Sequence, residues 1–422
     1  MKIYYFAFES IFDPIFDSQV VGFFKKINDR SDLSGNRSSL IVAGSIRDLF
    51  KKAYCQKKKS IKEKLNGRCI FFFKFPYFYR FQYLLRLSLV LNVVVCFFIL
   101  FFVLRMKRKE SAVCQCRTEM GAYILLKLKK FYYKNIKVIC DCRGIGSKEI
   151  LYKPGIRKKA LLSAKIREIE RYVYSESDYL FCVTRAFKEY ILNENKNKVK
   201  KIRVIPCCLD VNKFKYDPIL RKKVRQEMGI KSSDFVVLYS GSLNEWQLPS
   251  RMMEIFKIIR GIIKNSIFVM LTRDLKNAQS LFIGSGLKEK SFIISFKPYN
   301  MISKYLLAGD IGLLIREDND VNRVAFPVKF SEYIRCGVPV LSSISSDVMD
   351  LVRDHGLGYR LKNFNNDGEV KKVSRKIKED MAYIKSDEYK KKISKIIGKR
   401  IDWDNYITSV VEIYKGLVLN NQ

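Results

Sequence analysis

The sequence predicts an α/β protein made of two halves, each with a parallel sheet covered by helices on both faces. Continuous apolar runs of strand length alternate with helix-like segments throughout the second half. Such runs are typical of strands that are buried on both faces. The first half repeats this alternation less regularly, and a segment over 206–217 separates the two halves. The chain therefore belongs to the doubly wound α/β class, which binds ligands beyond the carboxyl ends of its strands.

The elements follow in order from these patterns. In the second half the predicted helices cover 249–264, 301–308 and 329–336, and the predicted strands cover 235–239, 267–271, 291–295, 311–315 and 338–341. In the first half the strand candidates are 3–8, 39–43, 70–73, 112–116, 138–141 and 179–183. The last stretch, 374–422, is predicted to be mostly helical, and its first part is rich in lysine.

Composition narrows the function classes. The chain has 422 residues, 48% of them apolar, with 80 Lys and Arg against 42 Asp and Glu, which gives a formal net charge of +38. This much apolar surface excludes a wholly disordered chain. The charge predicts a polyanionic neighbour, which is nucleic acid, an anionic membrane surface or a phosphorylated substrate.

Cysteine and histidine usage argues against metal-centred or His-centred chemistry. The chain holds 11 Cys and one His, His355, and its first seven residues lack a cleavable signal pattern. We therefore expect reduced thiols in the cytosol. A single histidine argues against a His-centred triad or a His cluster for metal.

Two Cys-x-Cys pairs stand in candidate strands, and each pair places both thiols on one face of its strand. If the strands are neighbours, the four thiols could converge on zinc or an iron–sulfur cluster. Because Cys-x-Cys matches the usual zinc spacing poorly and Cys is commonly buried, we expect ordinary packing and no metal. The four residues are Cys114, Cys116, Cys140 and Cys142.

An apolar run over 87–104 contains no charged residue and is followed by Arg105, Lys107, Arg108 and Lys109. Its length reaches the lower limit for a membrane-spanning helix. Since the segments on both sides of it read as parts of one domain, we favour a helix at the membrane interface, with its basic flank on anionic lipid. A buried helix and a single transmembrane helix are the alternatives.

The segment over 325–340 carries the most specific chemistry. Pro327 can begin a helix without the loss of a hydrogen bond, and the free N–H groups of that helix end suit a phosphate. Lys329 adds a positive charge there, and Glu332 lies one turn further on the same face, where its carboxylate can bind the hydroxyls of a sugar. An ordinary capped helix with an ion pair is the alternative.

This segment resembles the nucleotide-binding helix of family-4 retaining glycosyltransferases, in which a pattern similar to Pro327-x-Lys329-x-x-Glu332-Tyr333 occurs, followed by Gly337-x-Pro339-Val340. Tyr239-Ser240-Gly241-Ser242 resembles the first strand and glycine loop of their donor domain. Asp141-x-Arg143-Gly144 with Glu149 resembles a motif of a subset of the family, and Trp403-Asp404 resembles the start of its closing helix. The likeness covers most of the chain and is strongest from Asp141 onward.

The sequence departs from the family at several positions. Val324 stands where many members carry the first of two Glu residues, and Ser242 stands where an Arg is usual. Cys207-Cys208 replaces the Asn-Gly of the interdomain loop. The cations that neutralise a phosphate must then come from elsewhere, and the candidates are Lys329, Arg273, Arg316 and Arg323.

The resemblance implies a GT-B fold, in which two Rossmann-like domains with parallel sheets face each other across a cleft. The implied domains are an acceptor-binding domain over 1–210, with the apolar segment at 84–104, a nucleotide-sugar-binding domain over 211–398, and a closing helix over 399–422. The implied reaction moves a sugar from a nucleotide-sugar to a lipid-linked glycan acceptor with retention of configuration, in the synthesis of a capsule, O-antigen or exopolysaccharide. No protein nucleophile, cofactor or divalent metal is implied, and positioning and electrostatic stabilisation should dominate.

The implied roles are assigned residue by residue. Glu332, Lys329 and Arg273 are the expected catalytic residues. Expected nucleotide-sugar-binding residues are Gly241, Ser242, Arg316, Arg323, Pro327 and Tyr333, and expected acceptor-side residues are Ser18, Arg117, Asp141, Arg143 and Gly144. Asp141 with Arg143 has a structural ion pair as its alternative role, and Ser18 has helix capping as its alternative.

The expected location is cytoplasmic and peripheral, on the cytoplasmic face of the inner membrane, with an anionic membrane surface as a partner. An inactive membrane-associated scaffold with the same fold is the first alternative function. A nucleic-acid-binding protein is the second, but the basic residues are spread over the entire chain and no nucleic-acid motif is recognisable. We therefore expect no nucleic-acid partner.

Overall fold

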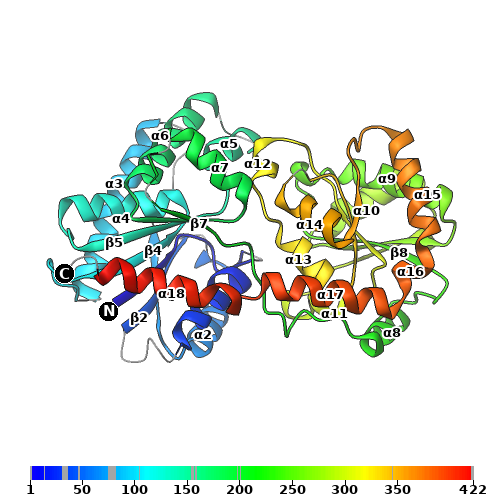
Figure 1. The fold of residues 1–422 in the computed structure, drawn as a ribbon, viewed down its shortest axis with the longest axis horizontal. Coiled ribbons are helices and arrows are strands. Elements are labelled where there is room, and N and C mark those ends of the chain that lie inside the picture. The colour runs from blue at the N-terminus through cyan, green and yellow to red at the C-terminus, as the bar shows by residue number, and fades with distance from the viewer. Residues whose placement is uncertain are drawn as a thin grey trace. The chain divides into compact units, whose positions relative to one another are not determined.

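The computed structural model describes residues 2–13, 15–30, 37–45, 48–74, 82–103, 105–153, 156, 159–196, 198–199, 201–344 and 346–419. The chain forms two compact units. The first contains Met1–Pro206 and Trp403–Gln422, and the second contains Cys207–Asp402. Figure 1 shows each unit as one sheet with helices on both of its faces, so the prediction of two parallel α/β sheets is confirmed.

The sheet of the first unit has seven parallel strands in the order β3-β2-β1-β4-β5-β6-β7. From β1 the chain adds strands towards one edge of the sheet, and from β4 it adds them towards the other edge. The place between β1 and β4 is therefore a switch point, where sheets of this type bind ligands. The strands are β1 (Lys2–Ala7), β2 (Arg37–Ser45), β3 (Cys69–Lys74), β4 (Ala112–Arg117), β5 (Ile136–Cys142), β6 (Tyr179–Cys182) and β7 (Ile202–Val204).

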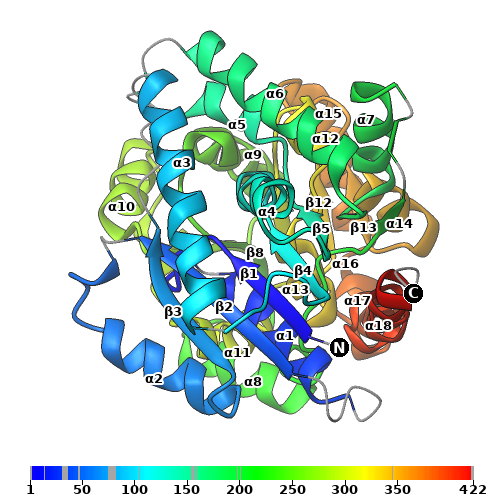
Figure 2. The ribbon, with the colours of Figure 1, turned by 90° about the vertical axis from the view of Figure 1, so that its left-hand side faces the viewer.

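The helices of the first unit divide between the two faces of this sheet. The helices α3, α4 and α6 cover one face, and α1, α2 and α18 cover the other (Figures 1 and 2). The helical segments are η1 (Asp17–Val21), α1 (Gly22–Asn28), α2 (Tyr54–Lys64), α3 (Gln82–Phe98), η4 (Ile99–Val103), α4 (Glu119–Phe131), α5 (Gly146–Tyr152), α6 (Lys159–Glu176), α7 (Arg185–Glu194) and α18 (Asp404–Leu419).

Strand pleating decides which side chains reach which face. Tyr5 of β1 pairs in register with Gln115 of β4, and both point towards α1 and α18, where Tyr5 stacks on Phe24 and Gln115 accepts a hydrogen bond from Tyr414. Residues at the neighbouring positions of the same strands therefore point to α4 and α6. Cys116 is one of these, because it lies against Gly121 of α4.

The C-terminal helix α18 belongs to the first unit. Trp403, which precedes it, is buried with its ring 5.0 Å from that of Phe23, and Lys26 forms an ion pair with Asp404 at 2.7 Å. The second unit ends just before, where Leu209 N donates to Ile401 O. The unit boundaries thus fall at 206/207 and 402/403, where the sequence predicted 210/211 and 398/399.

The apolar run over 87–104 forms the second part of α3 and all of η4, while Leu104 lies outside the described residues. Its buried side, which includes Leu89, Cys96 and Leu100, packs towards the unit. Of the helices that lie within the described ranges, none combines the length and the apolarity needed to cross a membrane.

The second unit has six parallel strands in the order β10-β9-β8-β11-β12-β13, and its switch point lies between β8 and β11. Its buried apolar strands confirm the runs that predicted them. The strands are β8 (Phe235–Ser240), β9 (Ser266–Leu271), β10 (Phe292–Ser295), β11 (Ile311–Leu314), β12 (Val340–Ser342) and β13 (Gly358–Arg360).

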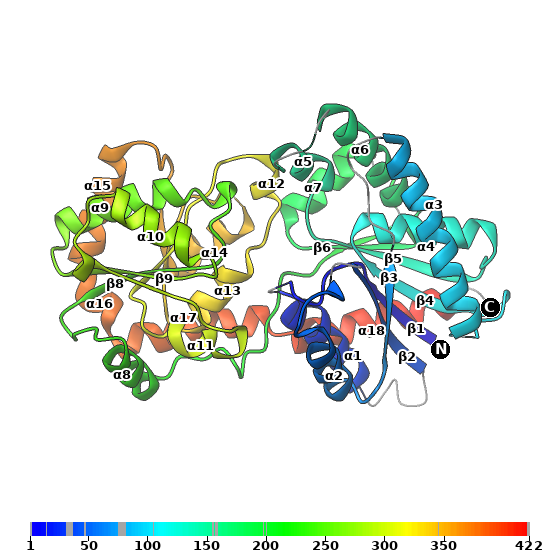
Figure 3. The same ribbon diagram turned by 180° about the vertical axis from the view of Figure 1, so that it is seen from behind.

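The helices of the second unit also form two layers. Figure 3 shows α9 and α10 on one face of the sheet and α11, α13 and α17 on the other. The segments are α8 (Pro218–Glu227), η5 (Glu245–Gln247), α9 (Pro249–Ile262), α10 (Leu275–Gly284), η6 (Glu289–Ser291), α11 (Tyr299–Leu306), α12 (Asp320–Arg323), α13 (Val328–Arg335), α14 (Asp347–His355), α15 (Asp367–Glu379), α16 (Met381–Lys385) and α17 (Asp387–Ile401).

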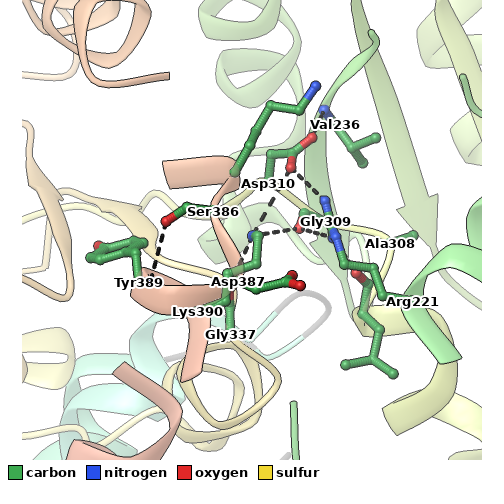
Figure 4. Close-up of polar contacts among 12 residues, drawn as sticks. Arg221, Val236, Ala308, Gly309, Asp310, Gly337, Ser386, Asp387, Tyr389 and Lys390 are labelled. Atoms are coloured by element: carbon green, nitrogen blue, oxygen red, sulfur yellow. Dashed lines mark hydrogen bonds and ion pairs between the residues drawn. The ribbon is translucent and has the colours of Figure 1, made fainter. Parts of the chain in front are cut away.

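A buried charge network joins helices α8 and α17 to the start of β11 (Figure 4). Asp310 is fully buried and accepts hydrogen bonds from Arg221 Nη2 at 2.6 Å, from Arg225 Nη1 at 3.1 Å and from Val236 N at 2.8 Å. Lys390 Nζ, also fully buried, donates to Gly337 O at 3.0 Å and lies 4.0 Å from the Asp310 carboxylate. One carboxylate thus compensates three buried cations.

Candidate functional site

A glycine turn follows the central strand β8 at the carboxyl edge of the second sheet. Gly241 has a φ of +146°, a backbone conformation that L side chains rarely adopt, and its N–H donates to Leu271 O at 2.9 Å. A Cβ on this residue would collide with Nζ of Lys329. Glycine is therefore required both by the turn and by the close approach of a lysine.

Lys329, on the first turn of α13, reaches this glycine turn. Its Nζ donates to Tyr239 Oη at 3.0 Å and to Gln247 Oε1 at 3.0 Å. Burial, and to a smaller extent the nearby charge of Arg316, lower the pKa of Lys329 to about 7, while Glu332 opposes the shift. The ammonium is held by two neutral oxygens and forms no ion pair within the described part of the chain.

Arg316 is the second cation at this edge and follows β11, the neighbour of β8. Its backbone N–H donates to Ser343 Oγ at 2.8 Å, and its Nη1 lies 3.4 Å from Asn322 Oδ1. Burial lowers the pKa of Arg316, so the surrounding protein disfavours its charge. Across the ranges that the structure describes, Arg316 also lacks an acidic partner. Two half-buried cations beside a glycine turn form a site that an anion would stabilise.

Glu332 lies one turn after Lys329, and 7% of its surface is exposed. Burial raises the pKa of Glu332 to about 7, against the lowering effects of Lys329, Lys213 and Tyr299. The next residue, Tyr333, is fully buried, and its Oη accepts a hydrogen bond from Ser240 N at 2.7 Å. Tyr333 therefore positions the end of β8, whereas Glu332 places a carboxylate on α13, one turn after Lys329.

The other predicted residues of this edge lie differently. Pro327 is the residue just before α13, not its first helical residue, and Ser242 accepts a hydrogen bond from Tyr239 Oη through its carbonyl at 2.5 Å. Arg273 is exposed after β9 and stacks over Phe296 at 5.5 Å. Arg323 is half-exposed and forms an ion pair with Asp318 at 2.7 Å, so its charge is already compensated.

Two residues that hold Lys329 were missing from the predicted site. The sequence placed Tyr239 at the end of a strand and at the start of the motif that leads into the glycine loop, and it assigned Gln247 no role in the site. The short helix η5 brings Gln247 back to the end of β8, which no periodicity in the sequence indicates. Asp274 Oδ2, which accepts from Leu243 N at 2.9 Å, fixes the loop between them.

Replacing Gly241 by alanine is expected to damage this edge without unfolding the unit. The added methyl group would need a disfavoured backbone conformation and would displace Lys329. We expect a loss of anion affinity of about tenfold to a hundredfold and destabilisation of about 1–3 kcal/mol. Alanine at Gly261, where a Cβ would meet no atom within 4 Å, is the control and should leave the affinity unchanged.

The first unit carries a second charged edge, at the carboxyl ends of β1, β4 and β5. Arg117, fully buried at the end of β4, donates from Nε to Glu9 Oε1 at 2.8 Å, and Asp141 accepts from Arg143 Nη2 at 2.7 Å. Tyr5 lies beneath them. Burial raises the pKa of Tyr5, and the negative charge of Asp141 raises it further. The structure thus brings Arg117, Asp141 and Arg143 to the same edge. Asp141 and Arg143 form the ion pair that was their alternative role.

Several buried polar atoms at this edge have no hydrogen-bond partner within the described residues. They are Tyr5 Oη, Glu9 Oε2, Gln115 Nε2 and Arg117 Nη1. Buried polar atoms in folded proteins are normally satisfied, so unsatisfied ones at a strand edge suit a polar ligand or water. A hydroxyl-rich ligand would supply both donors and acceptors here.

Gly144 and Ser18 complete the predicted residues. A Cβ on Gly144 would collide with the carboxylate of Glu149, so glycine allows Glu149 to fold back over the Asp141–Arg143 segment. Ser18 lies inside η1, and its hydroxyl donates to Ile15 O at 3.1 Å. The alternative role of Ser18 as a cap of the first helix is wrong, because the helical segment begins before it and its hydroxyl donates to a carbonyl of the preceding turn.

Residues 221–396, which run from α8 into α17, match the family model for glycosyl transferases group 1. This stretch contains Gly241, Arg316, Lys329 and Glu332, which line the edge described above. No curated protein sequence matches the chain.

Solved structures match the whole chain at low identity. Sucrose-phosphate synthase from Thermosynechococcus elongatus has a TM-score of 0.72 at 13% identity, and the match covers 100% of both chains. Anabaena HepE in complex with UDP and glucose has a TM-score of 0.69 at 14% identity over 99% of this chain and 100% of that one. WaaG, a glycosyltransferase involved in lipopolysaccharide biosynthesis, has a TM-score of 0.63 at 12% identity over 98% and 100%.

These matches confirm the predicted fold and reaction class, while the narrower assignment to family 4 stays a prediction. Residues 221–396 of the second unit are similar to the group 1 glycosyl transferases, and the protein is a glycosyltransferase with the GT-B fold.

Proposed function

We propose that the protein transfers a sugar from a nucleotide-sugar to a lipid-linked glycan in the synthesis of a surface polysaccharide, as a family-4 enzyme that retains configuration. The observation that carries the donor assignment is the pair of half-buried cations beside the Gly241 turn, Lys329 and Arg316, which form no ion pair with a residue that the structure describes. A diphosphate would supply the missing negative charge. HepE, which was solved with UDP-glucose, and WaaG, named for lipopolysaccharide biosynthesis, support the choice of donor and pathway class.

The proposed mechanism assigns donor binding to the second unit and acceptor binding to the first. Lys329 and Arg316 stabilise the leaving diphosphate, while Gly241 lets it approach the backbone. Glu332 accepts hydrogen bonds from the ribose hydroxyls. The acceptor hydroxyl is oriented at the edge that holds Arg117, Asp141 and Arg143, and no metal ion takes part in the transfer. Arg273, exposed after β9, remains a candidate for the sugar or the phosphate.

Donor-dependent release of nucleoside diphosphate tests this function. The full chain is incubated with a panel of nucleotide-sugars and with lipid extract from its source. We expect one donor to give nucleoside diphosphate and a glycosylated lipid in equal amounts. Absence of release from every donor, by protein that still binds a nucleoside diphosphate, would instead support the inactive scaffold, which Val324 in place of a family Glu allows.

Replacing Glu332 by glutamine is expected to raise the KM for the donor and to lower kcat/KM about a hundredfold. Glutamine keeps the shape but loses the charge-assisted hydrogen bonds to vicinal hydroxyls. Steady-state kinetics with the confirmed donor measure the change. Glu379→Gln, at an exposed carboxylate at the end of α15, is the control. Equal kcat/KM in Glu332→Gln and the wild type would contradict the assignment.

We also propose that the first unit binds the cytoplasmic face of the inner membrane through α3 and η4. Large apolar side chains stand exposed along these helices, and a basic segment follows them. The exposed residues are Leu87, Val90, Val94, Phe98, Phe101, Phe102 and Val103, and the basic ones are Arg105, Lys107, Arg108 and Lys109. Apolar insertion with a basic flank is the usual arrangement for binding anionic lipid.

A groove is lined by residues of α3, α4 and α6. Figure 2 shows these three helices on the same face of the sheet. Its lining includes Val90 and Val93 of α3, Phe131 and Lys130 of α4, and Lys165 of α6. The lining is mostly apolar and also holds Lys127, Lys130 and the ion pair of Lys165 with Glu168, which fits the tail and the phosphate of a lipid carrier. The groove therefore supports the choice of a lipid-linked acceptor.

The double variant Phe101→Ser, Phe102→Ser is expected to bind vesicles of anionic phospholipid at least tenfold more weakly, because each ring loses about 1.5–3 kcal/mol of apolar transfer free energy when fully inserted. Vesicle co-sedimentation measures the partition. Ile283→Ser, at a residue that is 76% exposed on α10, is the control and should not change binding. Equal binding of the double variant and the wild type would contradict insertion through η4.

A further inference from the structure

The inner face of the first sheet holds a cluster of thiols behind the acceptor edge. Cys140 and Cys142 both point from β5 towards α4 and α6, and their Sγ atoms lie 3.6 Å apart. Both are fully buried. Asp141, which lies between them in the sequence, points to the opposite face, where it pairs with Arg143.

A carboxylate completes the cluster. Glu119, the first residue of α4, is buried, and its carboxylate oxygen and the two thiol sulfurs all lie within 4.8 Å of one another. Tyr174 Oη of α6 lies 3.4 Å from Glu119 Oε1. A second buried carboxylate, Glu170, stands nearby on α6 and accepts hydrogen bonds from Ser147 N and Oγ at 2.9 and 2.6 Å.

Among the residues that the structure describes, no basic side chain compensates these two carboxylates. Throughout the part of the chain that the structure describes, neither Glu119 nor Glu170 forms an ion pair. A buried carboxylate normally pairs with a cation, coordinates a metal or keeps a proton. Two thiols, which are metal ligands in their ionised form, lie beside Glu119.

The separation of the two sulfurs, which is also the length of a hydrogen bond from Cys142 Sγ to Cys140 Sγ, suits a shared cation. A tetrahedral zinc ion holds thiolates at about 2.3 Å, which sets two such sulfurs about 3.7–3.8 Å apart. The observed sulfur separation of 3.6 Å agrees with this value. Sulfur ligands select zinc over magnesium or calcium, and full burial is typical of a structural site.

We propose that Glu119, Cys140 and Cys142 bind one zinc ion that joins the start of α4 to the end of β5. The fourth position is left for a water molecule. This proposal differs from the expectation of no metal that was drawn from the sequence. The spacing of the cysteines does not indicate Glu119 as a ligand, because Glu119 belongs to α4 and is distant from them in the sequence. By fixing β5 on both sides of Asp141, the ion would hold the acceptor edge in place.

Metal analysis of the full chain, expressed with zinc in the medium and purified without chelator, tests the site. We expect about one equivalent of zinc in the wild type and less than about a fifth in Cys142→Ser and in Glu119→Gln. Cys114→Ser is the matched control, because Cys114 is a buried thiol on the same face of the adjacent strand and lies outside the cluster. It should retain the full equivalent.

Cobalt substitution gives a second readout, whose decisive result comes from the wild-type chain. The wild-type chain loaded with cobalt should show the absorption of a tetrahedral thiolate–cobalt centre, and Cys114→Ser should show it equally. Wild-type protein that holds no zinc, binds no cobalt and has all its thiols free would overturn the proposal, and Glu119 would then carry a proton in place of the ion. Because these readouts do not involve transfer, they stand or fall independently of the proposed glycosyltransferase substrates.

Discussion

Replacing Lys329 by methionine is expected to lower kcat/KM for the confirmed donor by about a thousandfold, through kcat more than through KM. Methionine keeps the apolar stem of the side chain and removes the ammonium that the structure holds between Tyr239 Oη and Gln247 Oε1. The loss of one preorganised group that stabilises developing charge typically costs a factor of a hundred to a thousand in kcat. Steady-state kinetics of purified wild type and variant measure it.

A lysine elsewhere in the second unit provides the control for this prediction. Lys304 of α11 forms an exposed ion pair with Glu227 at 2.8 Å. Lys304→Met should therefore keep wild-type kcat/KM within about twofold. If Lys329→Met also kept it, the diphosphate would have to be neutralised without Lys329, by Arg316 or Arg273.

Replacing Asp310 by asparagine is expected to destabilise the second unit by about 3–5 kcal/mol, because Arg221, Arg225 and Lys390 would remain buried without a compensating charge (Figure 4). Chemical denaturation monitored by the far-ultraviolet circular dichroism of the full chain measures the change. Asp350→Asn, at an exposed ion pair with Arg353, should change the stability by less than about 0.5 kcal/mol. A small effect at Asp310 would show that the network contributes little to folding.

The same network predicts how stability depends on acid. Burial alone would raise the pKa of Asp310, but Arg221, Lys390 and Arg225 lower it from 3.8 to about 2. Since the folded-state pKa lies below the unfolded value, the stabilisation is complete above about pH 4 and is lost as the pH falls towards 2. Asp310→Asn should remove this part of the acid dependence.

Much of the fold could be predicted from the sequence because its determinants are local. The runs over 235–239, 267–271 and 311–315 are continuous apolar strands. They correspond to β8, β9 and β11, and no end differs by more than one residue. The helix predicted over 329–336 corresponds to α13. The short edge strands β7 and β13, of three residues each, were not predicted, because three residues carry no measurable period.

The candidate site was less predictable, because its geometry depends on residues that are distant in sequence. Lys329 was expected to neutralise a phosphate, but that Tyr239 and Gln247 hold it follows from the pairing of β8 with its neighbours. Arg323 was expected to do the same, yet Asp318, five residues earlier, already engages it. Glu119 reaches Cys140 and Cys142 only because β4 and β5 are adjacent in the sheet.

Binding of a nucleoside diphosphate to the full chain tests the central claim most directly. Thermal unfolding is followed with a panel of nucleosides, nucleoside monophosphates and nucleoside diphosphates, since a ligand that binds only the folded state raises the melting temperature. We predict that one diphosphate raises it, that the matching nucleoside does not, and that Lys329→Met abolishes the rise. A rise of the same size with the nucleoside, or in Lys329→Met, would contradict a diphosphate site at Gly241, Arg316 and Lys329.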